Sequence, residues 1–576
     1  MTAPTPSDDR PGGGRPDGSA EDPRADLRWG TIPRLLADVA GRLPDAEAVV
    51  EPDAGIRWSF ADLAVESARF TRAFVAREVA PGDRVAIWAP NSAWWAAAAL
   101  GALGAGAVLV PLNTRFKGAE AAYILRTARV RTLCTVQGFL GVDYPGLLAG
   151  LDVGEELRDI VVLQGDAAPA QAPRGAAAPE PLRLDRFLAA ADGVGDGEAA
   201  RRSAAVSPGD PSDLIFTSGT TGRPKGATAT HAQSLRTFGT WASIVGLREG
   251  DRYLVVNPFF HTFGYKAGLL ASLMAGATVV PEAVFDPDRV LDRIASERIS
   301  VLPGPPTLYQ SILAHPERPH RDLSTLRLGV TGAAVVPVEL VRAMSSELGF
   351  ETVLTAYGLT ESCGTVTMCR RSDPPEVVAR TSGRAIPGVE VRVVTAGGDE
   401  VGPGEPGEIV VRGYTVTTGY WDDPGATAEA VDAEGWLHTG DIGVIDRSGN
   451  VTVTDRLKDM YVVGGFNVYP AEVEARLREC PGVGAVAVVG VPDERLGEVG
   501  CAVVVGPPPG ESAGEFARRV LDWAGEAVAN FKAPRFAVVM DSLPVNASGK
   551  VVKRELRDRL TSPPEGLEIY ERRGKP

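Results

Sequence analysis

The sequence predicts an α/β protein with a large N-terminal domain of mixed and parallel sheets and a small mobile α/β C-terminal domain. Apolar strand-like runs alternate with helical stretches through much of the chain, which favours largely parallel sheets covered by helices. After about residue 390 the helices give way to short strands, which indicates a β-barrel-like part, and a compact α/β stretch then runs to the end. The 576 residues are enough for several domains.

The first clear strand is 84–88 (RVAIW), followed by a helix at 91–104 and a strand at 107–112. The unbroken apolar run at 93–110 is mostly alanine and glycine and is shorter than the roughly 20 apolar residues of a membrane span. We therefore predict a buried helix, capped near Asn91 or Ser92, and no membrane insertion. Further strands are predicted at 214–217, 252–256, 277–281, 301–303, 326–331, 389–394, 407–412 and 450–454, with helices at 287–298 and 338–348.

The domain boundaries follow from changes in composition. Residues 1–25 are rich in Pro, Gly, Asp and Arg and lack an apolar core, so they are predicted to be a disordered leader and not a signal peptide. The stretch 167–181 is predicted to be an Ala/Pro-rich surface loop. Composition places a boundary between about 455 and 459, which separates an N-terminal domain at 26–455 from a C-terminal domain at 459–576; that the segment between them, 456–458, is a hinge is implied only by the family resemblance given below.

Charge and cysteine usage exclude several classes of protein. A formal charge of −15 and a pI near 5.1 argue against a basic surface that binds nucleic acid. Anionic ligands must therefore be held by local clusters of positive charge and backbone N–H groups. The five cysteines form no CxxC pair, which argues against a disulfide framework or a zinc module. A reducing cytoplasmic location is expected.

One loop has the composition of a phosphate-binding site. After the strand ending near residue 217, hydroxyls, glycines and a lysine crowd together, and such glycines expose backbone N–H groups to an anion. Lys225 is followed by Gly226 and not by Ser or Thr, so the loop is not a Walker A motif. The predicted phosphate-binding residues are Thr217, Ser218, Gly219, Thr220, Thr221, Gly222 and Lys225.

This loop resembles the signature of the adenylate-forming (ANL) superfamily, which includes acyl-CoA synthetases, peptide-synthetase adenylation domains and luciferases. Five further motifs of that family follow in the expected order, and the resemblance extends from about residue 30 to 560. They are 257–261 (NPFFH), 355–361 (TAYGLTE), 435–441 (GWLHTGD), 455–459 (DRLKD) and 546–550 (NASGK).

The resemblance implies that ATP and a carboxylic acid form an acyl-adenylate, which then reacts with coenzyme A. It implies Glu361 as the Mg²⁺ ligand, Thr360 as a donor to the α-phosphate, Tyr357 as the adenine platform, and Asp441 and Arg456 as ribose or phosphate contacts. The remaining implied nucleotide contacts are Gly332, Ala333, Ala334, Ala356 and Gly358.

The C-terminal motifs imply a change of conformation between the two half-reactions. Lys550 is expected to stabilise the adenylation transition state electrostatically. Rotation about Lys458 would withdraw Lys550 and bring Gly464, Gly465 and Phe466 to a pantetheine tunnel. His438 and His231 are expected to be structural.

The acyl site is predicted from small and aromatic residues, because small walls leave room for a bulky group. His261 is assigned to its mouth as a gate or a carboxylate neighbour, with a core histidine as the alternative. The predicted lining is His261, Phe263, Gly264, Tyr265, Gly304, Thr331, Gly332 and Cys363.

The segment 259–263 (FFHTF) supplies no acidic residue to bind a substrate amine, which argues against an amino acid as the substrate. The stretch after Lys550 is too short for a fused carrier domain, which favours free CoA as the acceptor thiol. Stretches such as 257–268 (NPFFHTFGYKAG) resemble actinobacterial CoA ligases for ring-fused propionates of steroid breakdown. A polycyclic terpenoid acid fits equally, and a linear fatty acid is the runner-up. Three other classes of function remain as alternatives: a luciferase-like oxidase, an enzyme that passes its adenylate to a partner, and an inactive ATP-binding regulator. A homodimer is one assembly that the sequence allows.

Overall fold

The computed structural model describes most of the chain, without the side chains of residues 455, 456, 466 and 467. The described ranges are 28–165, 178–217, 224–332, 336–456, 459–463, 466–493, 495–528, 530–545, 551–564 and 566–572. The leader at 1–25 and most of the loop predicted at 167–181 lie outside them, as do residues 457 and 458 of the predicted hinge.

The first large sheet has seven strands in the order β7-β6-β5-β3-β4-β8-β9. All neighbouring strands are parallel except β8 and β9, which form an antiparallel pair. The strands are β3 (Arg84–Trp88), β4 (Val108–Pro111), β5 (Val130–Val136), β6 (Asp159–Gln164), β7 (Pro181–Arg183), β8 (Pro211–Thr217) and β9 (Lys225–Thr230). The accompanying helices are α2 (Ile32–Arg42), α3 (Phe60–Ala76), α4 (Ala93–Gly104), α5 (Gly118–Thr127), α6 (Leu184–Ala189) and α7 (Asp196–Ala205).

The second sheet consists of two ladders, β10-β11-β1-β2 and β12-β13-β14-β15. Val301 joins them, because it bridges Tyr253 of β10 on one side and Leu328 of β12 on the other. The strand predicted at 301–303 is therefore reduced to a single bridging residue. The strands are β1 (Glu47–Glu51), β2 (Ile56–Ser59), β10 (Arg252–Val255), β11 (Thr278–Pro281), β12 (Leu328–Thr331), β13 (Thr352–Tyr357), β14 (Thr367–Met368) and β15 (Arg384–Ala385). The helices are α8 (His231–Val245), α9 (Ala271–Ala275), α10 (Pro287–Ser296), α11 (Pro306–Leu313), α12 (Val338–Glu347) and α13 (Pro375–Arg380), with a π-helix η5 (Phe263–Leu270) before α9.

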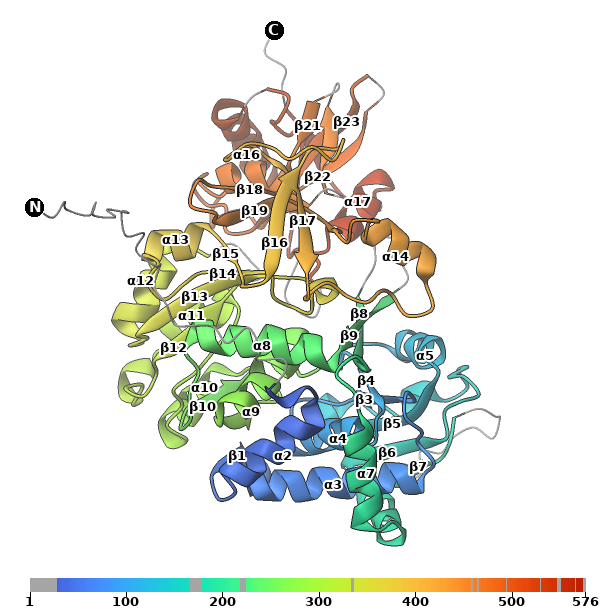
Figure 1. Cartoon of the computed structure of the whole chain (residues 1–576). Helices are drawn as coiled ribbons and strands as arrows, with labels where there is room; N and C mark the ends of the chain where they lie inside the picture. Colours follow the sequence, from blue (N-terminus) through green and yellow to red (C-terminus); the bar gives the residue numbers. More distant parts are fainter. Residues whose placement is uncertain are drawn as a thin grey trace, which may run out of the picture.

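The third sheet is an antiparallel meander that corresponds to the predicted β-barrel-like part. Its strands are β16 (Val389–Val394), β17 (Gly407–Gly413), β18 (Leu437–Ile445) and β19 (Val451–Arg456), and α14 (Pro424–Ala430) lies between β17 and β18 in sequence. The register shifts between Glu408 and Val410 and again between Ile442 and Gly443. Such irregularities bend a strand and increase its twist, which accounts for a curled sheet. Figure 1 places this sheet above the two larger ones.

The C-terminal part has its own sheet, drawn at the top of Figure 1. Alternate residues of β22 face opposite sides: Val486 and Val488 belong to one apolar cluster, and Ala487 and Val489 belong to another. The period of two therefore buries both faces of the sheet within this domain. Its elements are β20 (Tyr461–Val463), β21 (Phe466–Val468), α15 (Pro470–Leu477), β22 (Val486–Asp493), β23 (Gly497–Val505), α16 (Ala513–Ala527), β24 (Phe536–Met540), α17 (Lys553–Thr561) and β25 (Ile569–Glu571).

The alanine-rich run forms the buried helix α4, and the Ser92 hydroxyl caps it by accepting from the Trp95 N–H. Among the described residues, no helix is both long and apolar enough to cross a membrane. Asn91, the other predicted cap, has a different role. Its amide donates to the Val255 and Asn257 carbonyls and its oxygen accepts from the Phe259 N–H at 2.6 Å. Asn91 thereby fixes the segment that leads to His261.

Buried His231 at the start of α8 is expected to make the fold sensitive to acid. Its Nδ1 accepts from the Ile32 N–H at 3.3 Å, and burial lowers its pKa to about 4, with Asp210 raising it and Lys266 lowering it further. Because His231 is harder to protonate in the folded state, its neutral form contributes to the free energy of unfolding. This contribution is fully present above pH 6.5 and is lost as the pH falls towards 4, by about 3 kcal/mol in all. We expect His231→Gln to flatten the dependence of Tm on pH between 7.5 and 5. His320→Gln, at an exposed site, should leave the wild-type slope unchanged; equal slopes in all three proteins would contradict this account.

Candidate active site

Glu361 lies where three segments of the N-terminal domain meet. It belongs to the short 3₁₀ turn η7 (Thr360–Ser362) that follows β13. Its Oε1 accepts from the Thr217 hydroxyl and from the Tyr420 hydroxyl, each at 3.0 Å, and its backbone carbonyl accepts from the Thr417 N–H. The structure therefore brings the end of the strand before the phosphate loop to the predicted Mg²⁺ ligand.

The two ends of the phosphate loop are held side by side. Thr217 and Lys225 are the last residue pair of the β8–β9 ladder. The Lys225 ammonium lies 5.4 Å from the centre of the Tyr420 ring, which is within range of a cation–π interaction. Ser218, Gly219, Thr220, Thr221 and Gly222 lie outside the described residues, so their contacts stay predictions.

The predicted adenine and ribose residues are also brought together. The half-buried Tyr357 ends β13, and its hydroxyl donates to Oδ2 of Asp441 on β18 at 2.7 Å. Asp441 is paired in register with Arg456 of β19, so the backbone of Arg456 is adjacent although its side chain is not described. A carboxylate beside an aromatic ring is a suitable arrangement for holding ribose hydroxyls and adenine.

The carboxyl ends of the parallel strands β12 and β13 supply the neighbouring backbone. Thr331 pairs with Thr355, and a Cβ placed on Gly332 would lie 3.2 Å from the Ala356 carbonyl oxygen. A Cβ on Gly358 would lie 2.4 Å from the Gly364 carbonyl, so only glycine fits there. Ligands of open α/β sheets bind at such strand ends. Ala333 and Ala334 lie outside the described residues.

The segment predicted to border the acyl site opens the π-helix η5. His261 is exposed to solvent, and desolvation by nearby protein atoms lowers its pKa. Phe263 is half-buried. A Cβ on Gly264 would lie 2.1 Å from the Pro258 carbonyl oxygen, so this helix can start where it does only with glycine.

Other residues predicted to line the acyl site are buried. Tyr265 is fully buried with its ring 5.7 Å from that of Trp95, and Gly304 and Thr331 are buried as well. The Cys363 thiol is buried 3.4 Å from the Lys266 ammonium. Lys550, Lys458, Gly464 and Gly465 lie outside the described residues, and Phe466 is placed only by its backbone in β21.

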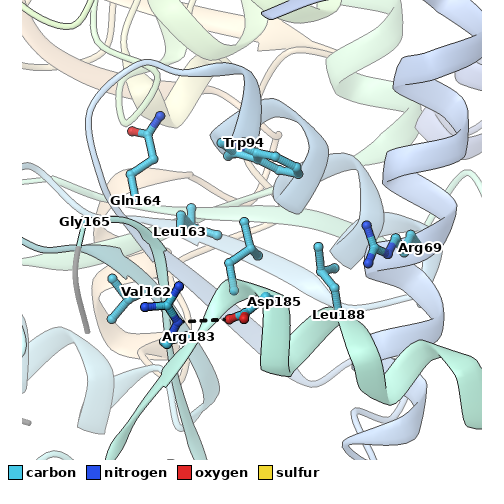
Figure 2. Close-up of a pocket in the computed structure, with 10 residues that line it drawn as sticks. Arg69, Trp94, Val162, Leu163, Gln164, Gly165, Arg183, Asp185 and Leu188 are labelled. Carbon is cyan, nitrogen blue, oxygen red and sulfur yellow. Dashed lines mark hydrogen bonds and ion pairs between the residues drawn. The ribbon is translucent and has the colours of Figure 1, made fainter. Parts of the chain in front are cut away.

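A pocket on the described surface lies elsewhere. It has a volume of about 340 Å³, borders α6 and the end of β6, and includes the Arg183–Asp185 ion pair at 3.1 Å (Figure 2). It contains none of the predicted site residues. Its lining is Arg69, Trp94, Val162, Leu163, Gln164, Gly165, Arg183, Leu184, Asp185 and Leu188. The hydrogen-bonded cluster around Glu361 is the better candidate, because it is built from groups that suit a nucleotide.

Tyr420 is a site residue that the sequence analysis missed. No motif singled it out, and its contact with Glu361 spans 59 residues of sequence. Burial and the neighbouring carboxylate raise its pKa, so the hydroxyl keeps its proton and donates. We expect Tyr420→Phe to slow adenylation about tenfold, because a hydrogen bond to a charged group contributes about 1.5 kcal/mol or more.

ATP–pyrophosphate exchange measures this effect. The matched control is Tyr570→Phe in β25, where the tyrosine hydroxyl also donates to a glutamate, Glu568, but at the surface. An exchange rate in Tyr420→Phe equal to that of Tyr570→Phe would remove Tyr420 from the site.

The residues present can accommodate a magnesium ion. No group of three or more metal-ligating side chains occurs among the described residues. Mg²⁺ in nucleotide sites needs only one or two carboxylates, because phosphates and waters complete its shell. Glu361 offers such a hard oxygen, held in place by two hydroxyl donors.

Comparison with known proteins shows the family of the chain. The model of the AMP-binding enzyme family matches residues 36–421, and that of the AMP-binding enzyme C-terminal domain matches 472–550. The chain is 49% identical over 528 residues to the 7a-methyl-1,5-dioxo-octahydroindenyl-propanoyl:CoA ligase of Rhodococcus jostii, covering 92% of this chain and 98% of that one. The Mycobacterium tuberculosis ligase of the same name is 48% identical over 535 residues (92% and 99%). ATP-bound MatB from Rhodopseudomonas palustris superposes with a TM-score of 0.76 at 29% identity (92% and 99%).

The fold and the site define an enzyme that activates carboxylic acids as adenylates. The chain belongs to the AMP-binding enzyme family and is an AMP-forming acyl-CoA ligase, with ATP and CoA as its co-substrates.

Proposed function

We propose that this ligase converts a ring-fused alkanoic acid, of the kind left by partial breakdown of a steroid, into its CoA thioester. The observation that carries the proposal is the identity of 48–49%, over nearly the whole length of both chains, to two ligases named for a fused bicyclic propanoate. Further support is the segment 257–268, which contains the exposed His261 two residues before η5 and resembles the same segment of ligases for ring-fused propionates. A polycyclic terpenoid acid has the same bulk.

In the first half-reaction a carboxylate oxygen attacks the α-phosphorus of ATP, and pyrophosphate leaves. Tyr357 and Asp441 would orient the nucleoside, and the Thr360 hydroxyl would donate to the α-phosphate. The resemblance assigns Lys550 to the developing negative charge. Glu361 would hold Mg²⁺, which would offset the negative charge of the phosphates when bound.

In the second half-reaction the CoA thiol, as it loses its proton, attacks the acyl carbonyl carbon, and AMP leaves. We infer that the C-terminal domain turns about Lys458 between the two steps and presents Gly464, Gly465 and Phe466 to the pantetheine arm. The support is the family pattern of residues 455–468 together with a C-terminal domain that has its own core. All five cysteines are free thiols, which supports a reducing, cytoplasmic setting.

A panel of acids tests the substrate. The fused bicyclic propanoate, a tricyclic homologue, an aryl acid and a linear medium-chain acid would be compared by AMP and acyl-CoA formation, with and without CoA. We expect kcat/KM for the ring-fused acids to exceed that for the linear acid by at least about tenfold, the usual range for shape discrimination by an apolar pocket. A preference for the linear acid would replace this proposal by a fatty-acid ligase. Adenylate without thioester would instead indicate delivery to a partner.

A further inference from the structure

A buried ion pair lies beneath the active site and has no place in the chemistry described so far. The Lys266 ammonium of η5 lies 2.9 Å from Oδ1 of Asp213 on β8, and both side chains are only 1% exposed. Oδ2 of Asp213 accepts from the Ser212 hydroxyl at 2.7 Å and lies 3.5 Å from that of Ser234. Besides Asp213, the Lys266 ammonium also lies near the sulfur of Cys363, at 3.4 Å.

The charged state of this cluster follows from its neighbours. Burial alone would lower the lysine pKa, but Asp213 and Cys363 act in the opposite direction, and the pKa of Lys266 is raised. Lys266 is therefore an ammonium held between the carboxyl group of Asp213 and the sulfur of Cys363. Placing such a pair in the interior costs desolvation energy, and an apolar pair of similar size is often as stable or more so. Stability by itself is thus a weak reason for the pair to be there.

The three partners belong to three segments that each reach the active site. Asp213 is in β8, four residues before Thr217. Lys266 is in the π-helix that starts two residues after His261, and π-helical turns often mark functional sites. Cys363 follows the turn that carries Glu361. The ammonium therefore connects the strand before the phosphate loop, the acyl-site segment and the Glu361 turn.

Cys363 is also the point where that turn is strained. Its φ of +55° is in the left-handed region, which is unfavourable for a residue with a side chain. The turn closes by bonds from the Cys363 N–H to the Thr360 carbonyl at 3.1 Å and from the Gly364 N–H to the Leu359 carbonyl at 2.8 Å. The contact with Lys266 holds the side chain of this strained residue, and with it the orientation of the turn.

We propose that Lys266 is a positioning residue for adenylation: through Asp213 and Cys363 it sets the position of Glu361 and the phosphate-loop strand relative to His261. In this arrangement the segments that bind the nucleotide and the acid are connected by one network of contacts. The position of the attacking carboxylate oxygen relative to the α-phosphorus therefore depends on the geometry of that network. A displacement of about 1 Å at such a site costs up to about 100-fold in rate.

The first test compares single and paired removal of the charges. Lys266→Met leaves Asp213 buried and unpaired, so both Tm and kcat should fall. The double variant Asp213→Asn/Lys266→Met removes both charges, and its Tm should return to within about 2 °C of the wild type. We expect its kcat for ATP–pyrophosphate exchange to stay about 10- to 100-fold low, while KM for ATP changes less than about threefold. Recovery of both Tm and kcat would reduce the cluster to a structural role.

The second test does not threaten the fold. Cys363→Gly removes the thiol contact at a backbone conformation that glycine adopts freely, so relief of strain offsets part of the burial lost with the side chain, and Tm should stay within about 5 °C of the wild type. A kcat lowered at least about threefold in this stable variant would support positioning. An unchanged kcat would overturn the part assigned to Cys363, whereas an unchanged kcat in the double variant would overturn the whole proposal. Because every comparison uses one acid, the outcome does not depend on which acid the wild type prefers.

Discussion

Glu361→Gln is expected to lower the rate of ATP–pyrophosphate exchange by about 100- to 1,000-fold, the usual effect of removing one charged or donor group that acts on the transition state. Glutamine keeps an acceptor oxygen for the Thr217 and Tyr420 hydroxyls, so the local hydrogen bonds survive while the negative charge is lost. The variant therefore isolates the charge that would hold Mg²⁺. The apparent requirement for MgCl₂ should rise together with the loss in rate.

The control for this variant is Glu390→Gln, an exposed glutamate that pairs with Arg412 on the neighbouring strand. It should be indistinguishable from the wild type in both Tm and exchange rate. If Glu361→Gln exchanges within about threefold of the wild type at every magnesium concentration, Glu361 is not the metal ligand and another carboxylate must be sought.

Lys550→Ala is expected to separate the two half-reactions. Acyl-adenylate formation should fall by about 100- to 1,000-fold, because the positive charge opposite the developing pentavalent phosphorus is gone. Thioester formation from supplied acyl-adenylate and CoA should remain within about threefold of the wild type, since the family resemblance implies that Lys550 has left the site before that step. Each half-reaction is followed by its own product, pyrophosphate or acyl-CoA.

A second lysine of the same domain controls for the loss of charge. Lys532 pairs with Glu472 at 2.6 Å on the surface, and Lys532→Ala should leave both half-reactions unchanged. Equal losses in both half-reactions of Lys550→Ala would indicate a structural role for this lysine, and intact adenylation would remove it from the first step.

The fold could be predicted where local pattern and burial agree. The strands predicted at 84–88 and 389–394 have those bounds in the structure, because an apolar run flanked by turn residues has few other options. The prediction at 301–303 was wrong in extent: only Val301 pairs with its neighbours. Whether a short apolar run becomes a strand or a single bridge depends on the neighbouring ladders, which local sequence does not specify.

The site could be predicted only where its residues lie in contiguous motifs. Thr217, Tyr357, Glu361 and Asp441 were predicted this way, and the structure brings them into two hydrogen-bonded pairs, while their roles in binding stay predictions. Tyr420 and the Asp213–Lys266 pair were not predicted, because nothing in the local sequence shows that Tyr420 meets Glu361 or that Lys266 meets Asp213. Such contacts result from the packing of whole elements.

The two apolar clusters of the C-terminal sheet have a consequence for the energetics of catalysis. One cluster packs under α15 and α16 and the other under α17, so this domain buries its apolar surface against itself. The reorientation proposed above would leave both clusters of described residues buried, so the free-energy difference between the two orientations would depend on contacts between the domains and on the bound ligands. Loss of pyrophosphate or arrival of CoA can then select the orientation, since differential binding of a few kcal/mol is enough to invert such an equilibrium.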